Sequence, residues 1–182
     1  MRILFILSFL IFASCDNSSL PKQKGFFAPE FNYPKYENQA LCNFKFSRNL
    51  SSNIIKTNEC NYEIYYKDLD AKIYLNKIKL TNNLNELSLK FDEKVFNNSE
   101  YADQILTSEY SDPSKKVYSR IYFFVGDTPS NIQFYLTDSV SNYISSSTYF
   151  NSKPNYDSLL PYIHYIRSDI RKFIESFDWI NE

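Results

Sequence analysis

The stretch from Lys116 to Phe150 constrains the fold more than any other part of the sequence. It contains three segments rich in aromatic and β-branched residues, separated by GDTPSN and SVSN. Such residues favour β-strands, and turns this short join antiparallel neighbours, because a parallel crossover needs a dozen or more residues. We therefore expect a three-stranded antiparallel meander within a mostly antiparallel sheet.

Side chains alternate between the two faces of a strand, so the first segment predicts two different sheet faces. One face carries Val117, Ser119, Ile121 and Phe123. The other face is aromatic, and with two residues of the next segment it forms a candidate contact surface: Tyr118, Arg120, Tyr122, Phe124, Gln133 and Tyr135. Tyr and Arg are enriched at interface hot spots. The simpler interpretation is that the N-terminal strands, or residues 26–36, cover this face.

The first fifteen residues resemble a bacterial lipoprotein signal. Arg2 precedes an apolar run of about ten residues, which is too short to span a bilayer but suits the core of a signal peptide. Ala13 and Ser14 then place small residues directly before Cys15, as in a lipobox. We expect removal of residues 1–14, with diacylglycerol on the Cys15 sulfur and an acyl chain on its amine. A plain signal peptide or an anchor helix is the alternative.

This signal sets the domain organisation and the compartment. We expect residues 15–25 to form the lipid anchor and a polar tether, and residues 26–182 to form a single globular α+β domain. An extended tether of this length reaches on the order of 30 Å at ~3.3 Å per residue. The domain would then be exported and membrane-bound in the cell envelope, facing the periplasm, with the choice of inner or outer membrane open.

Two cysteines remain after processing, and we expect Cys42 and Cys60 to form a disulfide, because exported proteins fold in an oxidising compartment. Each precedes alternating apolar residues, which places both on the apolar face at the start of a strand. Free buried thiols or a metal site are the alternatives. A metal would need further ligands, and no His or other Cys lies nearby in the sequence.

Two helices are expected. Thr81 can cap a mid-chain helix that ends near residues 97–100 and whose apolar residues recur every three or four positions: Leu84, Leu87, Phe91 and Val95. Strands are expected on either side of it, over 71–76 and 105–110. A long C-terminal helix begins near Asp157 or Ser158, which can cap it, and carries one apolar stripe for packing on the sheet: Leu159, Ile163, Ile166, Ile170, Ile174 and Phe177. We expect Pro161 to lie in its first turn, where proline is tolerated, and Asp169 to lie off the stripe on the polar side.

The residue content argues against several chemistries. The formal net charge of −1 leaves no basic footprint for nucleic acid, and two glycines cannot build a phosphate-binding loop. His164, the single histidine, lies beside the C-terminal apolar stripe and six residues from Ser158, too far for a side-chain hydrogen bond along a helix. We therefore expect no catalytic residues, no metal and no cofactor.

Several segments together resemble the gliding-motility lipoprotein D family (GldD) of Bacteroidota. They comprise the lipobox ending at Cys15, the two later cysteines, and the segments KGFF, KKVY, QFYLTDS, YFN, PN-x-DSL and F-x-W, of which the run over 133–159 is the most specific. Asn43 and Ser119 depart from the family pattern, which has Pro and Gly there, and residues 93–101 lack an expected His. Separately, the order of elements is similar to the PsbP/Mog1-like α/β sandwich, an analogy of fold alone.

The resemblance implies a function without catalysis. Members are membrane-anchored lipoproteins needed for gliding and are linked to the type IX secretion machinery, so the implied partners are other gliding or secretion lipoproteins or membrane proteins. We expect an assembly or scaffold component that is not an enzyme. The alternative is a lipoprotein that recognises cell-wall glycan or lipid through the aromatic sheet face.

Overall fold

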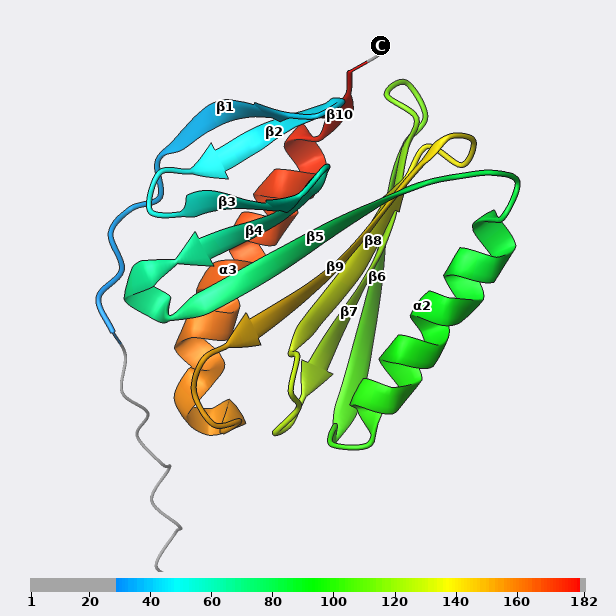
Figure 1. Cartoon of the computed structure of the whole chain (residues 1–182). Coiled ribbons are helices and arrows are strands. Elements are labelled where there is room, and N and C mark those ends of the chain that lie inside the picture. Colours follow the sequence, from blue (N-terminus) through cyan, green and yellow to red (C-terminus); the bar gives the residue numbers. More distant parts are fainter. Residues whose placement is uncertain (1–28, 181–182) are drawn as a thin grey trace, which may run out of the picture.

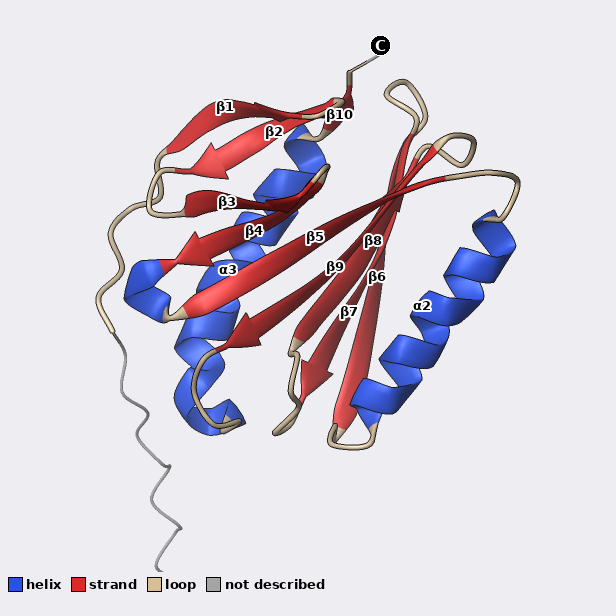
Figure 2. Ribbon diagram, viewed as in Figure 1, coloured by secondary structure: helices blue, strands red, loops and turns tan. Residues whose placement is uncertain are grey.

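The computed structural model describes residues 29–180 and has an α+β architecture built on two antiparallel sheets (Figures 1 and 2). A three-stranded sheet has the order β1 (Tyr36–Leu41), β2 (Phe44–Asn49), β10 (Asp178–Trp179). A seven-stranded sheet has the order β3 (Asn53–Asn58), β4 (Asn61–Tyr66), β5 (Ala71–Lys79), β9 (Asn142–Phe150), β8 (Ile132–Thr137), β7 (Val117–Val125), β6 (Gln104–Asp112). The helices are α2 (Leu84–Ser99), α3 (Tyr156–Ser176) and a 3₁₀ turn, η2 (Lys67–Leu69). The predicted fold class is confirmed.

The predicted meander forms the centre of the large sheet. Strands β7, β8 and β9 pair consecutively and antiparallel, and β9 also pairs with β5 along nine residues. Gly126 begins the first turn with a φ of 122°, and a Cβ there would come within 2.9 Å of the Tyr101 carbonyl oxygen. Both the backbone conformation and this close approach require glycine at that position.

Helix α3 covers one face of the large sheet and also contacts β2 of the small sheet (Figure 1). Its buried residues Ile166, Ile170 and Ile174 follow the predicted stripe, and Phe173 extends that stripe. Phe177 stacks on Phe44 of β2 with ring centroids 5.4 Å apart, and Phe173 contacts Phe46 of β2 at 4.4 Å. This aromatic cluster joins the two sheets and the helix into one apolar core.

Three details of α3 differ from the prediction. The helix begins at Tyr156, and its N-cap is Asn155 rather than Asp157 or Ser158. The Asn155 side chain accepts a hydrogen bond from the Ser158 backbone N–H at 3.2 Å. Pro161 is the sixth helical residue and therefore lies beyond the first turn, where it removes one backbone hydrogen bond. Asp169, expected on the polar side, is buried because it pairs with side chains from the small sheet.

Helix α2 covers the opposite face of the sheet, where it packs with residues of β7, β8 and β9 (Figure 1). Leu87, Phe91 and Val95 face the strands, as their spacing predicts, although the helix begins after Asn83 rather than after Thr81. The end of α2 is fixed by Asn98, whose side chain donates to the Ser130 carbonyl at 2.8 Å and accepts from its N–H at 3.2 Å. The prediction that N-terminal strands or residues 26–36 cover this face was wrong, because α2 occupies it.

The N-terminal strands lie elsewhere. Hairpin β1–β2 packs on α3, and Phe31 before it contacts the rings of Tyr162 and Tyr165 at 5.8 and 4.8 Å. Strands β1 and β3 were not predicted, since their sequences, YENQAL and NIIKTN, are largely polar and exposed. The lipobox, Cys15 and the tether predicted for residues 15–25 fall outside the described residues.

Candidate functional site

The predicted contact surface is brought together in space, but most of it is covered. Phe124 is 1% exposed and Gln133 is 1% exposed, while Tyr122 is also buried. Phe91 of α2 lies 5.3 Å from the ring of Tyr135 and 6.0 Å from that of Tyr122. The hypothesis of an open aromatic face for glycan, lipid or protein is therefore wrong, because α2 needs this face to bury its own apolar stripe.

The remaining members of that set form a polar rim. The Arg120 guanidinium pairs with Glu109 of β6, its Nη2 lying 2.9 Å from Oε1. Next to it, the Tyr122 hydroxyl donates to Asp92 of α2 at 3.1 Å. Burial raises the pKa of Tyr122, although the Arg120 guanidinium acts in the opposite direction. Tyr118 is partly buried. The rim thus fastens α2 and β6 to the meander.

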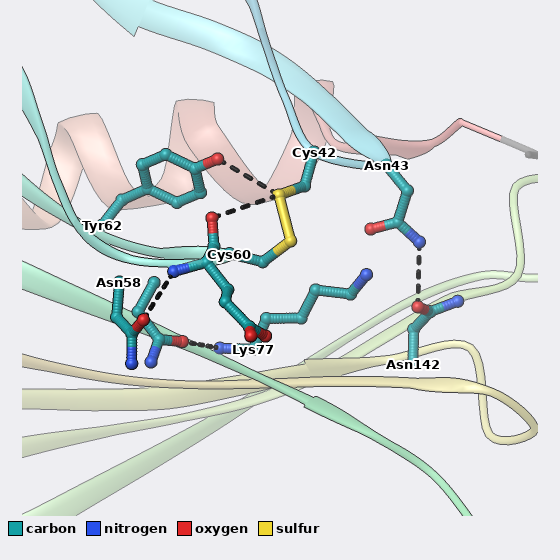
Figure 3. The surroundings of a disulfide bond; sticks show 9 residues. Cys42, Asn43, Asn58, Cys60, Tyr62, Lys77 and Asn142 are labelled. Atoms are coloured by element: carbon teal, nitrogen blue, oxygen red, sulfur yellow. Dashed lines mark hydrogen bonds between the residues drawn. A yellow bond between two sulfur atoms is a disulfide. The ribbon is translucent and has the colours of Figure 1, made fainter.

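The two cysteines form the expected disulfide, shown in Figure 3, with their Cα atoms 5.9 Å apart. Their positions differ from the prediction: both lie in tight turns before β2 and β4, and Cys42 is exposed with a φ of 46°. The Tyr62 hydroxyl lies 3.2 Å from the Cys42 sulfur. Because β2 belongs to the small sheet and β4 to the large one, the bond links the two sheets covalently.

A buried carboxylate makes a second link between the small sheet and α3. Asp169 accepts hydrogen bonds from the Tyr36 hydroxyl at 2.5 Å and from the Asn49 amide at 2.6 Å. Burial, and then the nearby Asp169 carboxylate, raise the pKa of Tyr66 well above its ordinary value. Asp169 and Asn49 are buried and Tyr36 is partly buried, so these hydrogen bonds stabilise the packing of the small sheet on α3.

The two edges of the large sheet differ in a way that matters for binding. Edge strand β3 is six residues long, contains Lys56 and has a register shift between Lys56 and Asn58. Edge strand β6 is nine residues long, pairs with β7 without a shift, and contains neither lysine nor proline. Proteins usually interrupt exposed edges with bulges, lysine or proline. Among residues 29–180 no strand pairs with the outer side of β6, so in this part of the chain β6 is an open edge. Its exposed residues include Ile105 and Leu106, each 39% exposed.

Sequence reasoning predicted the β6 strand over 105–110 but missed its position at the edge. Its side chains are exposed on both faces over most of its length. The sequence contained a partial signal, because LTSEYSD mixes polar and apolar residues without the alternation of a half-buried strand.

His164 and Ser158 are both exposed on α3. Within residues 29–180 no group of three His, Cys, Asp or Glu side chains could hold a metal ion, and no helix is long and apolar enough to cross a membrane.

The fold and its covalent link define a class of α+β domain in which a disulfide joins two antiparallel sheets, as is typical of proteins exported to an oxidising compartment. Comparison with protein families identifies the group within that class. The chain belongs to the family described as gliding motility lipoprotein GldD, whose model matches residues 16–179. This confirms the resemblance, and it places the chain among cell-envelope lipoproteins of gliding motility. No curated protein matches the sequence.

Proposed function

We propose that this protein is a non-catalytic scaffold lipoprotein of the gliding-motility and type IX secretion apparatus. Lipid on Cys15 would anchor it in the envelope, facing the periplasm. The domain would hold its partner by strand addition at the β6 edge. The partner is an extended segment of another envelope protein of that apparatus.

The observation that supports this proposal is the open edge of β6. A partner strand there would pair with the free backbone N–H and C=O groups of a nine-residue strand. Ile105 and Leu106 are consecutive, so they point to opposite faces of the sheet and would contact the partner strand on both sides. Backbone pairing supplies affinity in such complexes, and the side chains on alternate faces supply specificity.

The mid-chain helix adds a second apolar contribution on the same side of the domain. Leu89 and Phe96 are 69% and 75% exposed, and their separation of seven residues places them on one face of α2, opposite its buried stripe. Neither is needed for the core. Large side chains exposed in this way are more expected in a protein that binds a partner than in one that remains free.

A pair of matched variants tests the proposal in the native organism. Thr107→Lys places a lysine on the β6 edge, whereas Thr57→Lys places one on the β3 edge, and both positions are exposed in strands at opposite ends of the sheet. Lysine on an edge opposes strand addition. We expect chemical crosslinking in intact cells to recover a gliding or secretion protein with the wild type and with Thr57→Lys, and far less of it with Thr107→Lys.

Gliding and secretion provide the functional readouts. We expect a strain that lacks the protein to stop gliding, and the Thr107→Lys variant to restore gliding poorly although it reaches normal levels in the envelope. A deletion strain that still glides would refute the scaffold role. If the main crosslinked product is a second copy of this chain, strand addition would instead serve self-association, and the partner assigned here would be wrong.

A further inference from the structure

A large polar groove lies at the end of the domain where the two sheets meet, and the proposed function does not use it. Its volume is about 660 Å³, within the range of ligand pockets. Five separate segments line it: the β1–β2 turn, the end of β5, the β6–β7 turn, the β8–β9 turn, and the C-terminal segment after α3. No one of these segments could form the groove alone.

The groove carries an excess of positive charge on a chain whose formal net charge is −1. Four lysines and two aspartates line it, and the lysines are Lys77, Lys79, Lys115 and Lys116. Lys79 and Lys116 are exposed, while Lys77 and Lys115 are partly buried. Figure 3 shows the Lys77 side chain extending toward the Asn43–Asn142 pair, which also lines the groove.

The two aspartates are held by partners of their own. The Asp138 carboxylate accepts hydrogen bonds from the backbone N–H groups of Val140, Ser141 and Asn142 at 2.7–2.9 Å. Burial acts to raise the pKa of Asp138, but these hydrogen bonds outweigh it and hold the pKa below its ordinary value. Asp178 pairs with Lys45 at 3.2 Å. Both carboxylates are therefore engaged by partners that are not lysines of the groove.

Groups suited to a sugar lie beside these cations. Trp179, the single tryptophan of the chain, lines the groove and is fixed by a hydrogen bond from its Nε1 to the Lys116 carbonyl at 3.1 Å. The amides of Asn43 and Asn142 pair across the groove at 3.0 Å, and Ser114 and Ser141 supply hydroxyl groups. An aromatic ring, amides and hydroxyls with a few charged groups are what a pocket needs to orient a polar ligand.

The position of the groove argues against headgroups of the membrane that anchors the protein. The described chain starts at residue 29, and Glu30 and Phe31 lie beside Leu69 and Tyr165, close to the start of β5. The groove lies at the other end of β5, at Lys77 and Lys79. At a rise of ~3.3 Å per residue, Ala71 and Lys79 are roughly 26 Å apart. The groove therefore opens at the end of the domain away from the point where the tether joins it.

We propose that this groove binds an anionic saccharide, one that carries phosphate or carboxylate groups. Its lysines would pair with the acidic groups, while Trp179 and the amide pair would contact the sugar. The groove reaches the β6–β7 turn, but no residue of β6 itself lines it, so this binding does not use the backbone edge of β6.

Calorimetric titration of the lipidated mature chain in neutral detergent tests the ligand class. The probes are tetragalacturonate and phosphorylated maltotetraose, with unmodified maltotetraose as the neutral match. Trp179 fluorescence, recorded in parallel, reports whether the ligand reaches the groove. We expect both acidic saccharides to bind, to lose affinity as salt is added, and to change the fluorescence, and we expect the neutral one not to bind.

Two double variants test the site. Lys79→Gln with Lys116→Gln removes two groove lysines, and Lys56→Gln with Lys67→Gln removes two exposed lysines outside it. Losing a hydrogen bond to a charged group lowers affinity by about tenfold or more. We therefore expect the groove pair to weaken binding roughly tenfold or more, and the control pair to change the affinity less than about twofold.

Three results would overturn the proposal. The first is that neither acidic saccharide binds the wild-type chain. The second is that the control pair weakens binding as much as the groove pair, which would show attraction to surface charge in general. The third is that inorganic phosphate, a tetraglutamate peptide or phosphatidylglycerol vesicles bind more tightly than the saccharides, which would assign the groove to a different ligand.

Discussion

Replacing Phe91 by alanine tests whether α2 covers the aromatic sheet face as the structure describes. Phe91 is 3% exposed and lies against the rings of Tyr122 and Tyr135. Phe96, on the same helix, is 75% exposed. Phe96→Ala is therefore a matched control, since it makes the same chemical change in the same helix without removing a buried contact.

The expected cost differs strongly between the two variants. Truncating a buried Phe to Ala costs about 3–5 kcal/mol, through lost burial and the cavity left behind. The Phe91→Ala variant also loses two aromatic contacts, so we expect its loss of stability to fall within that range rather than below it. An exposed substitution away from special features changes stability by about 0.5 kcal/mol or less. Because domains have only about 5–15 kcal/mol of stability, the first change is large and the second small.

Urea unfolding of the mature chain, followed by far-ultraviolet circular dichroism, gives the free energy of unfolding. Hydrogen exchange across residues 84–99 then reports whether α2 leaves the sheet while the rest of the domain stays folded, and binding of a hydrophobic dye reports exposure of the aromatic face. We expect Phe91→Ala to increase both exchange and dye binding. Equal, small effects of the two variants would refute the docking of α2 and would return the aromatic face to consideration as a contact surface.

Three further changes have predictable effects on stability. Replacing Cys42 and Cys60 by serine should lower the free energy of unfolding by ~3 kcal/mol in the chain-entropy model, measured by urea unfolding against the oxidised wild type. The pKa of Tyr66 in the folded state lies above its unfolded value of about 10, so the stability that protonated Tyr66 contributes is complete below pH ~10. Above that pH the free energy of unfolding should fall by about 1.4 kcal/mol per pH unit, and Tyr66→Phe should flatten that slope. Asp169→Ala removes the acceptor of the buried Asn49 amide and of the partly buried Tyr36 hydroxyl. It should cost about 1–3 kcal/mol, seen as a lower urea midpoint with an unchanged slope.

The sequence was sufficient where one local pattern decided the structure. The meander followed from strand alternation and short turns, and both helices followed from apolar residues spaced three and four apart. The cysteine pair followed from the expected compartment. For the strands and helices the information lies within a few neighbouring residues. For the disulfide it lies in the two cysteines that remain after processing, so no knowledge of the tertiary arrangement was needed.

The sequence was insufficient where two distant segments had to be matched. The stripe of α2 and the aromatic face of β7 were both recognised, but nothing in either segment states that they pack together. Asp169 is polar and was expected in solvent, yet it is buried because Tyr36 and Asn49, over a hundred residues earlier, supply its hydrogen bonds. The groove lysines come from two separate segments, the end of β5 and the β6–β7 turn, and only the folded chain brings them to one place.

One short turn connects the stability of this domain with its proposed ligand site. Cys42 and Asn43 occupy the β1–β2 turn, where the disulfide ties the small sheet to the large one. The same turn lines the groove through Asn43, which reaches across to Asn142. The two sheets share no strand pairing, so packing in the common core and, at this turn, the disulfide hold the hairpin wall against the large sheet. The disulfide thus fixes the distance between groove walls that belong to different sheets, and this gives the bond a role in shaping the site as well as in stabilising the fold.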